Sequence, residues 1–426
     1  MKKKIFSLLA MVMVAMTASA KDVPSYTIAK KQQADITIKV NGEVATTAKQ
    51  NDVVTVVVTP PEGKYPATVV CRPYATWNVA KTRGSSVPFS ENFLAEKVKD
   101  AENTYKFTMP ASNVEVSVTY IENMDVETKE ADNEEKQVDN VTVEIKPAED
   151  TQPYIDPETG KTIVPVVVSS IDVPVQTDAS ETNKKELTVV IPATTTSADG
   201  SMVFTVGEIT ANALKVAAGK NCVIKKVVLP ETKDPIKIAD GAMKPEDEPV
   251  EVITPLAMLD DYSLNPALKE NFESQKISAI VTAPNKYWTF SSGVDCVLPE
   301  GVTAYIAEWD AEAKMPRIIA LSEDDLKLSG GQRGIKANNG VLLASEKGGE
   351  YEIVACPGNQ ESGSAVATTD ANSYKGNCLT PVIVSKNYPA GKTLILKDNE
   401  FHTIKSNLSE VKPCKAVFSL EKAGEK

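Results

Sequence analysis

Apolar and polar residues alternate in short stretches along most of the chain, which is the pattern of half-buried β-strands. The clearest stretch is 114–120, in which every second residue is valine or tyrosine and the residues between them are Glu, Ser and Thr. Residues 36–40 alternate in the same way, and the Asn41-Gly42 pair that follows is typical of a type I′ turn. The pattern predicts a small antiparallel β-domain over residues 21–121, opened by a hairpin.

Two short motifs occur twice within residues 185–262. Val-Val-Ile-Pro at 189–192 is similar to Val-Val-Leu-Pro at 227–230, and residues 208–215 are similar to residues 237–244. A unit of one short strand and one short apolar turn cannot bury its own apolar face, so such units must stack on each other. We therefore expect a degenerate repeat region here.

Short strand-like stretches also recur in residues 263–426, for example at 276–281 and 302–307, with Gly, Pro and Asn turns between them. Many short strands with such turns favour a β-sandwich. The length of 426 residues indicates several domains, because one hydrophobic core rarely serves so many. The predicted fold class is mostly β and multi-domain.

Composition changes abruptly between the first domain and the repeat region. Residues 122–150 are rich in Asp and Glu and contain no aromatic residue, and residues 151–184 are rich in Pro, Thr and Asp. A segment with so little apolar area cannot offset the entropy lost on ordering, so we expect a flexible linker over residues 122–184 with one strand near 164–171. Residues 125–139 lack the alternate Asp and the turn Gly that a calcium loop needs.

The first twenty residues have the three parts of a secretory signal peptide. Residues 2–4 are lysines, residues 5–16 are mostly apolar, and Ala18-Ser19-Ala20 supplies small residues for cleavage. The apolar run is shorter than the roughly 18 residues of a membrane-spanning helix, and no later stretch reaches that length. We expect an extracytoplasmic chain without a transmembrane segment, either secreted, at the cell surface or in the periplasm.

Net charge and histidine content restrict the classes of function that we expect for this protein. The net charge of −12 disfavours nucleic acid as a partner, because phosphate binding needs clustered Lys and Arg. His402 is the one histidine, so a Ser-His-Asp or Cys-His mechanism would have to use it, and no G-x-S-x-G motif accompanies it. We expect no enzyme activity, no cofactor and no metal site. A glycoside hydrolase needs only two carboxylates, so it stays open as a third hypothesis.

Six cysteines are widely spaced and form no C-x-x-C pair. A bridge between Cys356 and Cys378 and a set of isolated buried thiols are both compatible with the sequence. The pairing is left open for all six, which are Cys71, Cys222, Cys296, Cys356, Cys378 and Cys414.

Exposed aromatic rings are the residue type that stacks on sugars. Trp288 and Tyr305 lie in strand-like stretches, where an aromatic side chain normally packs in the core. Trp309 is surrounded by acidic residues at the end of such a stretch, and Trp77 lies outside one. Trp309 and Trp77 are therefore the candidate ligand-contact residues.

Three parts of the chain resemble modules of bacterial surface proteins. Residues 105–116, Tyr-Lys-Phe-Thr-Met-Pro-Ala-Ser-Asn-Val-Glu-Val, resemble the end of internalin B-repeat-like modules, and the similarity extends over residues 34–121. The repeated Pro-ending strands, with Cys222 before Leu229-Pro230, are similar to the leucine-rich repeats of BspA-like surface proteins of Bacteroidota. The stretch from Pro299 to Ala416 resembles the C-terminal β-domain that often follows such repeats.

Together these features predict a non-enzymatic secreted or cell-surface interaction protein, adhesin-like, whose partner is a host or matrix protein or a glycan. The resemblances imply structural spacers and repeats, and they carry over no binding residue. The alternative is a carbohydrate-binding accessory protein of a glycan-using bacterium, and the third hypothesis is an unrecognised glycoside hydrolase.

Overall fold

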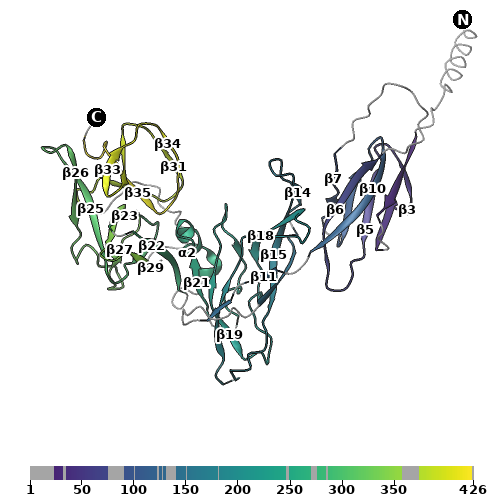
Figure 1. Ribbon diagram of the computed structural model, residues 1–426, viewed down its shortest axis with the longest axis horizontal. Coiled ribbons are helices and arrows are strands. Elements are labelled where there is room, and N and C mark those ends of the chain that lie inside the picture. Colours follow the sequence, from purple (N-terminus) through teal and green to yellow (C-terminus); the bar gives the residue numbers. More distant parts are fainter. Residues whose placement is uncertain are drawn as a thin grey trace, which may run out of the picture. The chain divides into compact units, whose positions relative to one another are not determined.

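The computed structural model describes residues 24–31, 35–74, 91–99, 101–121, 124–126, 128–130, 141–149, 151–180, 182–245, 249–269, 276–284, 286–356 and 374–424. Within them the protein is mostly β, with two short α-helices and several separate sheets (Figure 1), which confirms the predicted fold class. The chain forms two compact units, Met1–Glu122 with Lys146–Pro165 and Thr196–Phe204, and Asn123–Ile145 with Val166–Thr195 and Thr205–Lys426. The expected signal peptide lies outside the described residues.

Two five-stranded sheets form the N-terminal domain. The first has the order β4 (Thr47–Lys49), β1 (Ser25–Lys30), β10 (Asn113–Ile121), β6 (Tyr65–Tyr74) and β7 (Phe93–Leu94). The second has the order β3 (Glu43–Val44), β2 (Ile36–Val40), β5 (Val53–Val58), β9 (Thr104–Thr108) and β8 (Glu96–Lys97). Asn41 and Gly42 join β2 to β3 with φ of 54° and 88°, and a type I′ turn requires positive φ at both positions. The predicted hairpin is confirmed.

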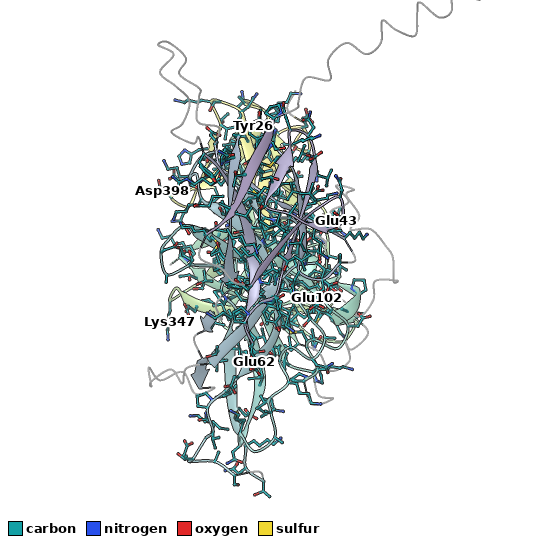
Figure 2. The ribbon with its side chains drawn as sticks, turned by 90° about the vertical axis from the view of Figure 1, so that its right-hand side faces the viewer. Tyr26, Glu43, Glu62, Glu102, Lys347 and Asp398 are labelled. Atoms are coloured by element: carbon teal, nitrogen blue, oxygen red, sulfur yellow. The ribbon has the colours of Figure 1, made fainter. Side chains whose placement is uncertain are left out.

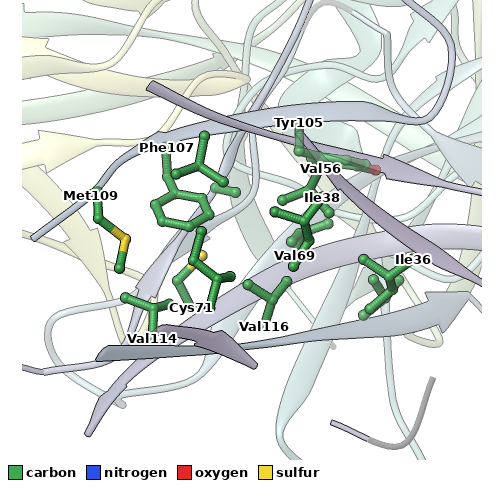
Figure 3. Close-up of a cluster of buried hydrophobic side chains, with 14 of the residues drawn as sticks. Ile36, Ile38, Val56, Val69, Cys71, Tyr105, Phe107, Met109, Val114 and Val116 are labelled. Carbon is green, nitrogen blue, oxygen red and sulfur yellow. The ribbon is translucent and has the colours of Figure 1, made fainter. Parts of the chain in front are cut away.

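One core fills the space between these two sheets. Val114, Val116 and Val118 of β10 are buried, and the residues between them remain partly exposed. Figure 3 shows side chains from both sheets meeting in this core, among them Ile36, Ile38, Val56, Val69, Cys71, Tyr105, Phe107, Met109, Val114 and Val116. Each large apolar side chain buried here contributes roughly 1.5–3 kcal/mol, so the alternating pattern itself supplies the stability of the domain.

Several strands form within the segment that composition assigns to a linker. They are β11 (Met124–Val126), β12 (Thr128–Glu130), β13 (Val141–Pro147), β14 (Tyr154–Ile155) and β15 (Thr162–Asp172). Alternate residues of β13 and β15 are valine or isoleucine and are fully buried. Mean composition hides this local alternation, which gives each strand one apolar face. Residues 131–140 lie outside the described residues.

A sheet of seven strands is built on these elements. Its main path is β11, β13, β15, β18 (Met202–Ile209) and β17 (Thr194–Thr196), with β14 paired to β15 and β20 (Lys237–Ile238) paired to β18. β11 pairs antiparallel with β13, and β12, which follows it closely along the chain, pairs antiparallel with β16 (Lys185–Val190) of another sheet. One short segment therefore supplies an end strand to each of two sheets.

The self-similar motifs of the repeat region lie side by side. β16 pairs in parallel with β19 (Cys222–Val228), and the register places Val189 opposite Val227. In the seven-stranded sheet, β18 pairs in parallel with β20, and the register places Ile209 opposite Ile238. In both pairs, equivalent positions of the two similar sequences lie opposite each other.

An eight-stranded sheet runs from the repeat region into the C-terminal region. Its order is β12, β16, β19, β21 (Glu251–Thr254), β22 (Ile277–Ala283), β29 (Gly349–Cys356), β24 (Asp295–Val297) and β27 (Gly334–Ile335). β21 pairs in parallel with β22, and β22 pairs antiparallel with β29. Between β21 and β22 lie η1 (Leu256–Met258), α2 (Leu259–Ser263) and α3 (Pro266–Lys269), so the expected boundary at residues 262/263 falls inside α2.

Two four-stranded sheets complete the C-terminal region as a β-sandwich. The first is β23 (Tyr287–Phe290), β28 (Val341–Ser345), β25 (Val302–Asp310) and β26 (Met315–Ala320), and the second is β30 (Leu379–Val382), β35 (Lys415–Ser419), β32 (Thr393–Lys397) and β33 (Glu400–Thr403). Leu342 from the first sheet and Leu379 and Phe418 from the second share one core.

A two-stranded ribbon and a tight turn finish the C-terminal region. β31 (Lys386–Tyr388) pairs with β34 (Leu408–Val411). Asp398 (Figure 2) and Asn399 make the turn from β32 to β33 with positive φ. None of the helices among the described residues combines the length and apolar character that a membrane-spanning helix needs.

Candidate functional site

Trp309, the candidate ligand-contact residue that the structure describes, lies at the end of β25. Its side chain is half-buried and its ring lies 6.1 Å from the ring of the fully buried Phe418, centroid to centroid. The indole Nε1 is buried and has no hydrogen-bond partner among the described residues. The ring therefore packs against the core of the sandwich and keeps part of its surface in solvent. Trp77 lies outside the described residues.

Three further half-buried aromatic residues flank the same core. Tyr287 of β23 and Tyr305 of β25 make an edge-to-face pair with centroids 5.4 Å apart, and Phe401 of β33 lies 5.5 Å from Phe418. Trp288 is buried, as its strand-like context predicts, whereas Tyr305 is only half-buried. Tyr287, Tyr305 and Phe401 thus keep some of their surface in solvent, and sequence reasoning did not single out Phe401 because one aromatic residue beside a turn carries no periodic signal.

His402 lies on the terminal strand of its sheet, as this sheet is described. It is exposed and stands opposite Ile395 of β32. Its neighbour Phe401 points into the sandwich, because successive residues of a strand face opposite sides. The His402 side chain therefore lies on the opposite face of the strand from Phe401 and is exposed to solvent.

The most unusual polar cluster in the described residues surrounds Asp260 on α2. Asp260 is 6% exposed. Its Oδ1 accepts a hydrogen bond from Ser292 Oγ at 2.5 Å, and its Oδ2 accepts one from the Gly293 backbone N–H at 2.7 Å. Burial raises the pKa of Asp260 to about 6, against the two hydrogen bonds, which lower it, and with a smaller contribution from Asp261, which raises it. We call Asp260, Ser292, Gly293, Cys296 and Cys414 the Asp260 joint.

Two thiols complete the joint and neither is activated. Burial raises the pKa of Cys296 and of Cys414 far above the ordinary value, and the nearby Asp260 carboxyl acts in the same direction. The Cys414 thiol donates a hydrogen bond to the backbone oxygen of Leu256 in η1 at 2.9 Å. Because the thiolate is the nucleophile, a thiol held protonated does not suit covalent catalysis. Within the described residues, no three or more His, Cys, Asp and Glu side chains are grouped to hold a metal ion.

A row of charged side chains, which we call the charged row, crosses the eight-stranded sheet from β19 to β29. Lys226 Nζ lies 2.8 Å from Glu251 Oε2, Lys276 contacts Glu251, and Lys276 Nζ lies 2.8 Å from Glu352 Oε2. Ser278 Oγ donates a hydrogen bond to Glu352 Oε1 at 2.7 Å. Burial acts to raise the pKa of Glu251, but hydrogen bonds from the two lysines lower it overall. The row links β19, β21, β22 and β29 where the repeat region meets the C-terminal region.

Two more contacts stabilise the junction between these two regions. The Ile236 backbone N–H donates a hydrogen bond at 2.8 Å to the hydroxyl of Tyr262, which is fully buried on α2. Lys412 Nζ lies 2.5 Å from Glu231 Oε1. Sequence reasoning missed this set because its partners are far apart in the chain. The one local signal was the Asp260-Asp261 pair inside an otherwise apolar stretch.

All six cysteines are free, so the alternative of isolated thiols is the one that the structure adopts. The register of β24 and β29 places Cys296 opposite Ala355 and Asp295 opposite Cys356. Cys296 and Cys356 therefore point to opposite faces of the sheet and cannot bridge.

We expect Cys356 to react rapidly with a thiol reagent in the native protein and the other five cysteines to react only when the structure around them opens or unfolds. Cys356 is partly exposed, whereas the others are buried. The measurement is a colorimetric thiol count on protein prepared without reductant, before and after adding guanidinium chloride. Fewer than six thiols after unfolding would contradict the assignment, since it would reveal a disulfide.

Comparison with known proteins adds no relative. The sequence matches no protein-family model, no curated protein and no solved structure significantly. The structure itself shows a mostly β, multi-domain protein.

Proposed function

We propose that the protein is a non-enzymatic, extracytoplasmic interaction protein, adhesin-like, that presents its C-terminal sandwich to a host or matrix protein or to a glycan. The observation that carries the proposal is the continuous eight-stranded sheet, which joins the repeat region and the start of the C-terminal region into a single hydrogen-bonded element. A surface held on such an element loses little conformational entropy on binding, which favours affinity.

The contacts around α2 support the same role. In the Asp260 joint, the Asp260 carboxyl fastens α2 to the loop after β23, and the Cys414 thiol donates a hydrogen bond to η1. The charged row and the pair of Lys412 and Glu231 fasten the surface of the same region. These groups stabilise an architecture, as expected of a protein that displays a surface. The net charge of −12 favours a protein or a neutral glycan over nucleic acid.

The alternative is carbohydrate binding, and the half-buried rings of Tyr287, Tyr305 and Phe401 favour it. Partly exposed aromatic rings fixed by a core beneath them are suited to stack on sugar rings, because their orientation is set before binding.

The test is an array of glycans and host-matrix proteins probed with the chain from residue 21 to residue 426. The chain is kept intact because a fragment beginning at residue 275 would remove β21 and expose an edge of β22. Saturable binding to matrix proteins supports the leading proposal, and saturable binding to glycans supports the alternative. Absence of binding to both classes would refute both.

Two variants locate the binding surface. We expect the double substitution Tyr287→Ala and Tyr305→Ala to weaken glycan binding at least tenfold if these rings carry it, whereas Tyr154→Ala should have no effect. Tyr154 is the matched control because it is an exposed tyrosine of another sheet. Release of reducing sugar from a bound glycan would instead favour the glycoside hydrolase hypothesis.

A further inference from the structure

Asp260 is a buried carboxyl without a cationic partner among the described residues. Both of its oxygens accept hydrogen bonds from neutral donors, Ser292 Oγ and the Gly293 N–H. Neutral donors compensate a buried charge only incompletely, so the charged form is costly and the protonated form is favoured there.

Asp261 on the same helix acts on the Asp260 carboxyl, and its charge disfavours the charged form of Asp260. The thiols of Cys296 and Cys414 lie near this carboxyl, and burial together with Asp260 raises the pKa of both, so they remain neutral. α2 also packs against η1, α3, β22 and β29. η1 and β22 carry no titratable side chain, and α3 carries Lys269 at its end. β29 carries Glu350, Tyr351, Cys356 and Glu352, and Glu352 is engaged by Lys276 and Ser278.

The joint can accept a proton without losing a hydrogen bond. Ser292 Oγ already accepts the Val294 backbone N–H at 3.2 Å and can accept a second donor, which a protonated Asp260 would provide. The Ser292 hydroxyl hydrogen can then turn to the sulfur of Cys296, with which Ser292 also interacts. Protonation removes the buried charge and keeps the contacts between α2 and the loop after β23.

We propose that Asp260 takes up a proton on mild acidification and that this uptake tightens the joint between α2 and the C-terminal region. The Asp260 joint then opens less often at acidic pH than at neutral pH. This is the reverse of the usual effect of acid on ion pairs. It is independent of the proposed binding function, since it concerns the closure of the joint and not a ligand.

The sign follows from the two protonation equilibria. The folded pKa is about 6 and the ordinary value is 3.8, so the folded joint binds more protons than the open one between these values. The stabilisation is fully present below the ordinary value and is lost as the pH rises through 6. Between pH 7.5 and pH 5 the ratio of closed to open joint should increase about tenfold.

The experiment measures how fast Cys414 is labelled in the intact chain, with mass spectrometry to identify the residue. Cys414 is buried in the joint, so its labelling reports opening. Rates for the natural chain are divided by rates for Asp260→Asn at each pH, which cancels the pH dependence of the reagent and of the other carboxylates. We expect this ratio to fall about tenfold from pH 7.5 to pH 5. A ratio that does not change with pH would overturn the proposal.

Two further variants complete the test. Asp240→Asn alters an exposed Asp outside the joint. The Cys414 labelling rate of this variant, divided by that of the natural chain, should stay constant with pH. If Asp260→Asn does not fold, as judged by circular dichroism, Ser292→Ala replaces it. That variant removes a hydrogen bond that favours the charged form, so the onset of tightening should move to higher pH. An unchanged onset in a folded Ser292→Ala protein would equally overturn the proposal.

Discussion

Replacing Gly334 by alanine should destabilise the C-terminal region by about 3 kcal/mol or more, or prevent it from folding. A Cβ atom at this position would overlap the backbone oxygen of Cys296 and would lie 2.5 Å from Cδ1 of Leu328. Because the first of these atoms belongs to the paired strand β24, a rotamer change cannot relieve the contact and the β24–β27 pair must separate. The measurement is the free energy of unfolding in urea, followed by circular dichroism.

Gly330→Ala is the matched control, since Gly330 lies in the loop that leads to β27. A Cβ atom there would meet only the flexible side chain of Gln332, at 3.3 Å, so the loss should stay below about 1 kcal/mol. Equal unfolding energies for the two variants would show that β27 does not approach β24 as closely as described.

Replacing Phe418 by alanine should cost about 3–5 kcal/mol. Phe418 is fully buried between the two four-stranded sheets and packs against the rings of Trp309 and Phe401. Its removal leaves a cavity that sheets held by backbone hydrogen bonds cannot collapse to fill. Urea unfolding followed by tryptophan fluorescence measures the loss, because Trp309 reports on this core.

Phe401→Ala provides the comparison, because Phe401 contacts the same ring and is only half-buried. Its cost should be about half that of Phe418→Ala, in proportion to the apolar area withdrawn from water. A larger cost for Phe401 than for Phe418 would contradict the assignment of Phe418 to the centre of this core.

Local chemistry accounts for the features that the sequence predicts well. The Asn41-Gly42 turn depends on two adjacent residues that tolerate positive φ, and the burial of Val114 and Val116 depends on a period of two. The similarity of residues 189–192 to residues 227–230 anticipates neighbours in one sheet, and the parallel register of β16 and β19 places them there.

Two kinds of feature could not be predicted, for different physical reasons. The strands within residues 122–184 were hidden because acidic residues dominate the mean composition, although β13 and β15 each keep one apolar face. The Asp260 joint was hidden because Asp260 and Ser292 are 32 positions apart and meet only after β22 and β23 have formed. No periodicity or spacing rule links residues whose proximity arises from tertiary packing.

The directions of the strands in the eight-stranded sheet determine which kind of pairing each strand makes with its neighbours. β16, β19, β21 and β22 run parallel, whereas β12 at one side and β29 at the other run antiparallel to their neighbours. A strand inserted between β19 and β21 in the same direction would offer both neighbours the parallel pairing that they already make. The parallel interior of this sheet could therefore take a further strand of the same direction without a change in the pairing geometry of the strands beside it.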